Sequence, residues 1–287
     1  MMHTWAPILL AITAAVLIAG GTVLRQRASA ASGAITAGWW LGAVVALLGF
    51  GLQATALGLG SILVVQPLVV LAVLFALPME AWIDKRRLER GEWLWGVILV
   101  VCVVLFLVLA RPVSTDRRPN MLVMVITVSV LVVGLIGIVV NAERCRSAHF
   151  RALSYGLASG ALFGVSALLI KAVALRVVDD PVSLVHHAEM YLLVVVVVLA
   201  IIAQQRGFGA GDLQTSFPAM NVMEPTVAMV LGVALLGENI YVSAPTAVFL
   251  CVVALVAATA VVKLAQDAAI RGEDQRHSRE EAVNVGS

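Results

Sequence analysis

Charged residues and cysteines are scarce in this chain of 287 residues. Asp, Glu, Lys and Arg make up 13% of it, whereas 61% is hydrophobic. No water-soluble fold of this length could bury so much apolar surface, so the composition excludes a soluble globular protein. The 3 cysteines, Cys102, Cys145 and Cys251, show no metal-ligand spacing and no even disulfide framework.

Motifs for nucleotide binding and covalent catalysis are absent as well. The sequence contains no phosphate-binding loop, no zinc signature and no nucleophile motif. We therefore expect neither an enzyme nor a pump driven by ATP on this chain alone. We also expect no cofactor, no metal site and no nucleic-acid partner.

Long apolar runs fill the chain instead. A helix needs about 20 apolar residues to cross the hydrocarbon core of a bilayer, and these runs are continuous, which favours helices over the alternating strands of a β-barrel. The sequence predicts an all-α polytopic membrane protein with about nine transmembrane helices. Their expected positions are 5–24, 34–57, 61–79, 92–110, 121–140, 152–172, 183–203, 214–237 and 243–264.

Lys and Arg are unevenly distributed between the connecting segments. Alternate segments hold fourteen of the 19, and these segments are 25–33, 80–92, 141–151, 204–212 and the tail from residue 263. The positive-inside rule places that set in the cytoplasm. Because the number of spans is odd, we expect the N-terminus outside and the C-terminus inside the plasma (inner) membrane.

One pattern occurs twice, 158 positions apart. In each copy an amide or acidic residue precedes a proline, and a glutamate follows after twelve mostly apolar residues. The copies are Gln66-Pro67 with Glu80, and Glu224-Pro225 with Glu238. Proline-interrupted membrane segments at corresponding positions of two halves are typical of secondary transporters.

The duplication extends to the spans around this pattern. The first span ends on Arg25 and the sixth on Lys171, each after a stretch rich in small residues. Four spans and one connector make an odd number, so the second copy enters the membrane inverted. We expect a first repeat over 1–110, a connector with the fifth helix over 111–150, a second repeat over 151–265 and a disordered cytoplasmic tail over 266–287.

Glycines indicate where helices approach closely. Gly156, Gly160 and Gly164 recur every four residues and predict a small face against which another helix can pack. Gly134 and Gly137 suggest a similar face on the fifth span.

Glu224 is the one acidic residue that lies well inside a predicted span. An acid at that depth costs about 3 kcal/mol on insertion scales, so it usually faces a wet cavity or a partner. A carboxyl group there could take up and release a proton in competition with a cationic substrate. The alternative is a protonated Glu224 that hydrogen-bonds a neighbouring helix and has only a structural role.

Other polar residues could line the same site. Pro225 frees a backbone carbonyl near Asn221, which shares a helix face with Glu224, and Pro67 would act in the same way beside Gln66. We expect a helix break at both prolines. Two further candidates, each with a structural alternative, complete the set: Gln53, which could instead bridge helices, and Lys171, which could instead extend to the lipid interface.

The paired Pro and terminal Glu resemble the drug/metabolite transporter superfamily, in which such a motif recurs in both halves. The resemblance spans nearly the whole of residues 5–264, and nine spans with Trp39-Trp40-Leu41-Gly42 at the second are similar to the NIPA-type magnesium-transporter branch. It implies a translocator whose two halves rock about a central cavity.

The expected function is therefore a permease that moves a small organic or lipid-linked substrate by alternating access, coupled to a proton or substrate gradient. A magnesium or other divalent-cation transporter is the alternative within transport, although one carboxylate supplies few of the oxygen ligands that such an ion takes. A non-transporting scaffold subunit of a lipid or envelope-synthesis complex is the alternative of another class. The expected partners are the lipid bilayer and the substrate, with a second copy or another membrane protein left open.

Overall fold

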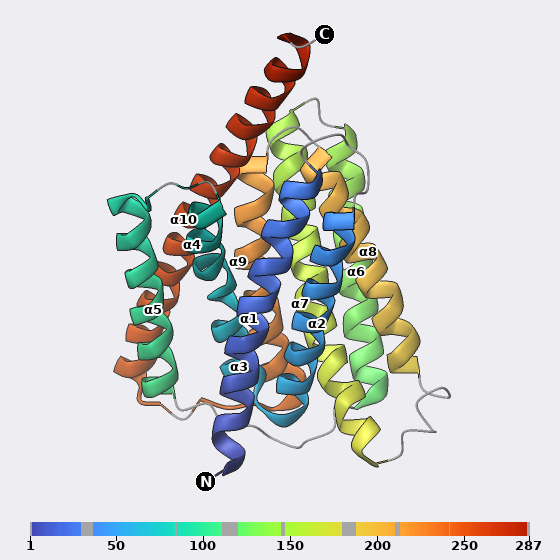
Figure 1. Ribbon diagram of the computed structural model, residues 1–287. Helices are drawn as coiled ribbons and strands as arrows, with labels where there is room; N and C mark the ends of the chain where they lie inside the picture. Colours follow the sequence, from blue (N-terminus) through green and yellow to red (C-terminus); the bar gives the residue numbers. More distant parts are fainter. Residues whose placement is uncertain are drawn as a thin grey trace.

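The computed structural model describes residues 2–29, 37–83, 85, 87–110, 120–144, 147–179, 188–209, 213–240 and 242–285. These residues form a bundle of helices (Figure 1). The helices are α1 (Met2–Ser29), α2 (Ala37–Leu59), α3 (Ile62–Val70), α4 (Ala72–Ile83), α5 (Arg90–Ala110), α6 (Met121–Arg144), α7 (Ala148–Asp179), α8 (Ala188–Gly209), α9 (Leu213–Leu236) and α10 (Ala244–Val285).

Nine segments of the described chain are long and apolar enough to span a membrane, and they coincide with the nine predicted runs. The largest difference in length is in the sixth, which extends over Ala148–Arg176. The start of α1 and the end of α10 lie at opposite ends of the bundle, as an odd number of spans requires (Figure 1). We refer to these ends as the N-terminal face and the C-terminal face.

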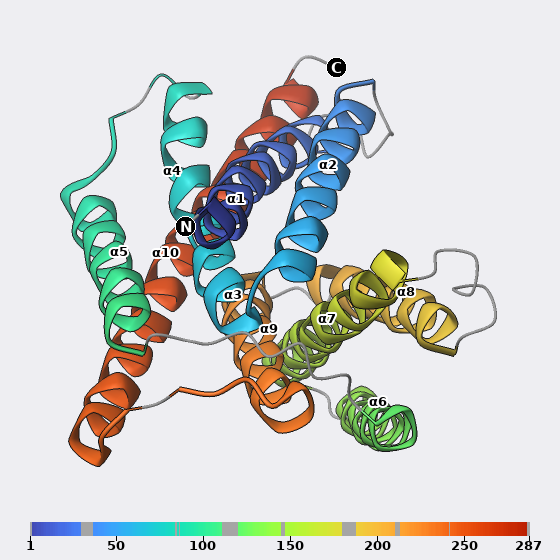
Figure 2. The same ribbon diagram turned by 90° about the horizontal axis from the view of Figure 1, so that it is seen from below.

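Helices α1 to α4 pack together on one side, and α7, α8 and α9 on the other. The two groups meet where α2 lies against α7 and α3 against α9. Helix α5 packs mainly on α10, and α6 stands at the edge of the bundle beside α7 (Figure 2). The main contacts between the sequence halves therefore include α3 with α9 and α5 with α10.

The third span is interrupted between α3 and α4. Pro67 has no N–H to donate to the carbonyl of Leu63, and one turn later the helix closes with a tighter bond from the Leu71 N–H to the Leu68 carbonyl, at 3.1 Å. Helix α9 behaves differently, because it runs without interruption through Pro225. The helix break expected at Pro225 is therefore wrong: a single lost hydrogen bond is tolerated within a membrane helix when neighbouring helices support it.

Close contact between α7 and α9 depends on the three glycines identified in the sequence. A Cβ on Gly160 would lie 2.5 Å from the carbonyl oxygen of Met220, and one on Gly164 would lie 2.6 Å from that of Glu224. Gly156 faces the backbone of Ser216 in the same way. The predicted small face is thus confirmed, and it brings the backbones of α7 and α9 into contact.

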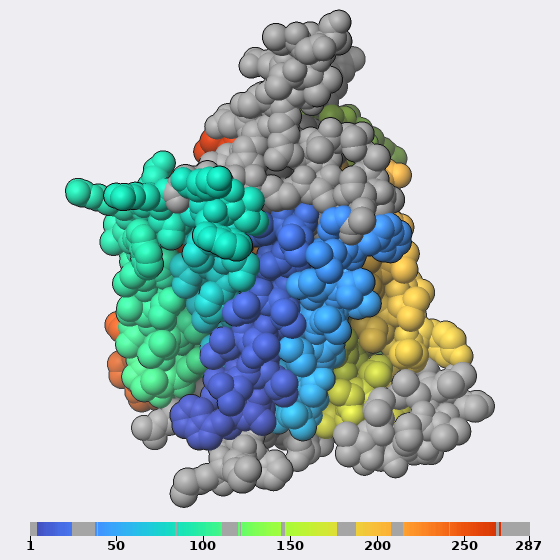
Figure 3. Space-filling view, viewed as in Figure 1, coloured from blue at the N-terminus to red at the C-terminus, as the bar shows by residue number. Residues whose placement is uncertain are grey.

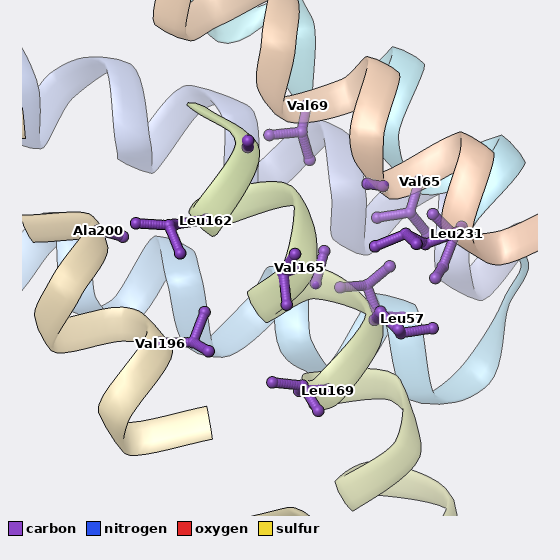
Figure 4. Close-up of a cluster of buried hydrophobic side chains, with 14 of the residues drawn as sticks. Leu57, Val65, Val69, Leu162, Val165, Leu169, Val196, Ala200 and Leu231 are labelled. Atoms are coloured by element: carbon purple, nitrogen blue, oxygen red, sulfur yellow. The ribbon is translucent and has the colours of Figure 1, made fainter. Parts of the chain in front are cut away.

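Apolar side chains from both halves fill the space around α7. Leu57 of α2 and Val65 of α3 pack toward Val165 of α7 and Leu231 of α9 (Figure 4). This cluster is the core of the contact between the halves, and α7 is the span with the largest buried share, 72%.

The outer surface of the bundle is apolar, as lipid contact requires. Figure 3 shows α1, α2, α4 and α5 side by side on one face. Leu9, Leu47, Trp82 and Trp93 of these helices are more than half exposed. The glycine face expected on α6 is not used within the described chain, because Gly134 and Gly137 have no neighbouring atom within 4 Å of their Cβ positions.

The C-terminal tail differs from the expectation of disorder. Helix α10 continues beyond its membrane span, which ends at Asp267, and runs to Val285. The tail is rich in Ala, Glu, Gln and Arg, which favour helix, and it extends a helix that is already nucleated.

Candidate functional site

A buried cluster at the N-terminal face joins three segments that are far apart in the sequence. Lys171 comes from the second half of α7, Glu238 follows the end of α9, and the remaining members form the turn from α2 into α3. We call this cluster the Glu238 clasp; its members are Gly60, Ser61, Ile62, Leu63, Lys171 and Glu238.

The carboxylate of Glu238 accepts hydrogen bonds from several donors at once. Oε1 accepts from the Ile62 N–H at 2.9 Å and from Lys171 Nζ. Oε2 accepts from the Ser61 hydroxyl at 2.7 Å and from the Leu63 N–H at 3.1 Å. Lys171 Nζ also donates to the carbonyl of Gly60 at 2.8 Å. Each charge is therefore compensated by a partner charge and by backbone groups.

This arrangement satisfies the start of α3. The first N–H groups of a helix lack partners within it and carry a partial positive charge, so an anion is favoured there. Ser61 occupies the N-cap position, and its side chain accepts from the Leu63 N–H at 3.0 Å. Glu238 thus adds a second, charged cap, supplied by the other half of the chain.

The backbone at the end of α9 positions Glu238. Gly237 has φ 67, a left-handed conformation that other residues adopt at a cost. The Glu238 N–H then donates to the Gly232 carbonyl at 3.2 Å, which ties the residue after Gly237 back to the end of α9. The chain reverses at this point, so the Glu238 side chain is directed toward Ile62.

Lys171 does not extend to the lipid interface, which was the structural alternative for it. The side chain is 2% exposed and ion-paired, so it neither extends to the lipid interface nor presents a free ammonium to a substrate. Its partner Glu238 is 0% exposed. Removing two charges from water is costly unless they are paired, so the pair is stable only while both members remain in the clasp.

A second ion pair lies further along α7. Arg176 donates to Glu189 of α8 at 2.7 Å. This pair joins two helices of the same half, whereas the Glu238 clasp joins the two halves. His186 and His187 precede α8 and fall outside the described residues.

Glu224 occupies the middle of α9, 11 residues from Leu213 and 12 from Leu236. At about 1.5 Å per residue it is more than 15 Å from either end of the helix. The side chain is half-buried, and no described residue forms a hydrogen bond or ion pair with its carboxyl group. Asn221 does not partner it, because Asn221 Nδ2 donates to the Phe217 carbonyl at 2.7 Å.

Two glutamines present buried polar atoms without partners. Gln66 in α3 is 1% exposed and its Nε2 forms no hydrogen bond; Gln53 in α2 is 5% exposed and its Oε1 forms none. Buried polar groups are normally satisfied, and exceptions in native structures call for a ligand, an ion, water or a functional reason. These atoms are therefore candidates to meet a ligand or water.

The structure sets Gln66 and Glu224 at different levels. Ile62 at the start of α3 lies beside Gly232, whose Cβ position is 3.4 Å from the Ile62 Cβ, and α3 and α9 run in opposite directions (Figure 1). Glu224 is eight residues from Gly232 and Gln66 four from Ile62, a difference of about 6 Å along the axes. The two residues are therefore staggered along the contact between the halves.

Within the described ranges, no three His, Cys, Asp or Glu residues gather closely enough to hold a metal ion.

At the C-terminal face, Tyr155 of α7 donates to Glu143 of α6 and accepts from Arg206 of α8 at 3.4 Å. This second polar group ties the connector helix to the second half.

The nine membrane-spanning segments of the described chain define a multi-pass α-helical membrane protein. The chain is 38% identical over 258 residues to an uncharacterized protein of Corynebacterium glutamicum, and the match covers 84% of this chain and 88% of that relative. The chain belongs to the same family as this relative. No family model matches the sequence, and no solved structure matches it.

Proposed function

We propose that this protein is a permease of the inner membrane that moves a small organic or lipid-linked substrate by alternating access, with Glu224 as the coupling group. The observation that carries the proposal is the position of Glu224. It is an acidic side chain at mid-helix, without a partner among the described residues, on a helix that contacts the other half of the chain. An ionisable residue in a membrane span that lacks a structural partner is a functional candidate by default.

The pairing of helices supports two inverted repeats. If spans one to four correspond to six to nine, then α3 with α4 corresponds to α9, and α5 corresponds to α10. Equivalent helices should then meet at the pseudo-two-fold axis, and both α3 with α9 and α5 with α10 are in contact. Together with the repeated Pro-and-Glu motif, this supports the resemblance to the drug/metabolite transporter superfamily.

The polar groups favour an organic substrate. We assign to the proposed site the carboxyl group of Glu224 and the unpaired amide atoms of Gln66 and Gln53. Such a set suits a molecule with one cationic or protonated centre and a few hydrogen-bonding groups, whereas a divalent cation takes several oxygen ligands. The same orphaned atoms argue against a purely structural scaffold, since a scaffold gains nothing from buried unpaired amides.

Reconstitution in liposomes tests the proposal. The purified protein is incorporated into vesicles with a pH-sensitive dye inside, and panels of amines, amino acids, nucleotide sugars and Mg²⁺ are added outside. We expect uptake of an organic substrate to depend on pH and to move protons. Glu224→Gln should abolish the proton movement, and Glu89→Gln, at an exposed position on the C-terminal side, serves as the matched control.

Three outcomes contradict the proposal. Full activity with unchanged pH dependence in Glu224→Gln would remove Glu224 from the mechanism. Uptake of Mg²⁺ without any organic cargo would favour the divalent-cation alternative. Absence of every flux, together with stable co-purification of a membrane enzyme, would favour the scaffold.

A further inference from the structure

We propose that the Glu238 clasp is the gate of the N-terminal face, that this gate is closed in the structure, and that it opens when the two halves rock apart. The inference rests on the permease proposed above and adds the residues that control access from one side. On the predicted topology, this is the outer side of the membrane.

The clasp can act as a gate because it connects the halves. Gly60, Ser61, Ile62 and Leu63 belong to the first half, whereas Lys171 and Glu238 belong to the second. Four of its hydrogen bonds cross between halves: those from Ser61 Oγ, Ile62 N and Leu63 N to Glu238, and that from Lys171 to Gly60. Rocking of the halves about the α3–α9 contact must therefore break the clasp or leave this end closed.

The clasp also excludes solvent. Ser61 is 3% exposed, Lys171 2% and Glu238 0%. Leu57 and Val65, each about one helical turn from the clasp along the chain, are completely buried and belong to the apolar cluster in Figure 4. Apolar packing is non-directional and can separate and re-form, whereas the clasp bonds fix one closed geometry.

The opposite face has a different arrangement. The repeat-related acid Glu80 lies in the last turn of α4 at the C-terminal face. The main described neighbours of α4 are α1, α10 and α3. The start of α9 packs instead on α7, where Ser216 faces Gly156. The described helix contacts therefore differ between the two faces.

Chemical labelling of a buried position tests the gate without knowledge of the substrate. Cys102, Cys145 and Cys251 are replaced by Ser, and Val65→Cys is introduced as the reporter. A membrane-impermeant maleimide is added from the side of the N-terminal face to the full-length protein in oriented vesicles. We expect slow labelling with an intact clasp and labelling at least about tenfold faster with Lys171→Met, because loss of one partner strongly destabilises a buried ion pair.

The second ion pair of α7 provides the matched control. Glu189→Gln removes the partner of Arg176 at the same face, but this pair lies within one half. We expect no change in the labelling of residue 65. Equal acceleration in Glu189→Gln and Lys171→Met would indicate general loosening and would overturn the gate.

Spin labels at Leu59→Cys and Asn239→Cys test the same idea with the clasp residues intact. Leu59 belongs to the first half and Asn239 to the second, and both side chains are exposed. Two populations of distance in lipid bilayers would support opening, and a single short distance under every condition would overturn it. Unchanged labelling of residue 65 in a monodisperse Lys171→Met protein would also overturn the gate proposal. Opening without flux of any cargo would support the gate proposal and contradict the permease.

Discussion

The hydroxyl of Ser61 donates a hydrogen bond of 2.7 Å to Glu238, a residue 177 positions further along the chain. The same carboxylate is ion-paired with Lys171. The start of the third span is therefore completed by the chain segment that follows the eighth span, and the stability of either half depends on the other.

The first prediction concerns the coupling of Lys171 and Glu238. Lys171→Met should lower the free energy of unfolding by about 3 kcal/mol, because it leaves a buried carboxylate without its cation. Glu238→Gln should also destabilise, and the double variant should lose less than the sum of the two. Thermal unfolding of the purified protein, arranged as a double-mutant cycle, measures this. Strict additivity would show that the two charges are not coupled.

The second prediction concerns the backbone at Gly237. Gly237→Ala should destabilise by about 1 kcal/mol, since a left-handed conformation is unfavourable for a residue with a Cβ. Gly51→Ala is the matched control, because Gly51 lies within α2 with nothing within 4 Å of its Cβ position. That change should be neutral or stabilising. If the two variants melted alike, the conformation of Gly237 would not matter to stability.

The third prediction concerns the contact between α7 and α9. Gly164→Ala should destabilise by about 1–3 kcal/mol, because the added methyl group would meet the Glu224 carbonyl oxygen and force the helices apart. Gly134→Ala on α6, which has open space around it, should not. Melting temperatures in detergent compare the two, and tolerance of Ala at position 164 would contradict the observed close packing.

The fourth prediction separates stability from activity at Gln66. Gln66→Met removes a buried amide nitrogen that has no partner, so the free energy of unfolding should stay the same or increase. If Gln66 contacts the substrate, uptake by the same variant should fall. Gln205→Met, at an exposed position of α8, should alter neither. A large loss of stability in Gln66→Met would instead assign Gln66 a structural role.

Much of the fold follows from local properties of the sequence. The nine spans are long apolar runs, and such runs in a membrane form helices because every backbone polar group must be satisfied within the segment. The glycine face of α7 was also predictable, because the spacing of Gly156, Gly160 and Gly164 is itself the recognition signal for a close helix contact.

The clasp could not be predicted in the same way. Lys171 and Glu238 each lie near the end of a span, where a charge is usually hydrated, so their pairing depends on how distant segments meet. Two local signals were present. Ser61, a residue type preferred at helix N-caps, follows a short turn, and Gly237, a residue type preferred just after a helix end, precedes Glu238. Likewise, the sequence showed a proline at position 225 but not the support that keeps α9 continuous there.

The Glu238 clasp has a consequence for water. While the clasp is closed, the carboxylate of Glu238 serves as the cap of α3, so the first N–H groups of that helix have a dry partner. When the halves separate, the Leu63 N–H keeps the Ser61 hydroxyl as its partner. The Ile62 N–H can then be satisfied only by water or by an anion that arrives from outside. Opening of this face would thus begin with hydration of a helix end, and a solute with a carboxylate or phosphate group would be drawn to the position that Glu238 has left.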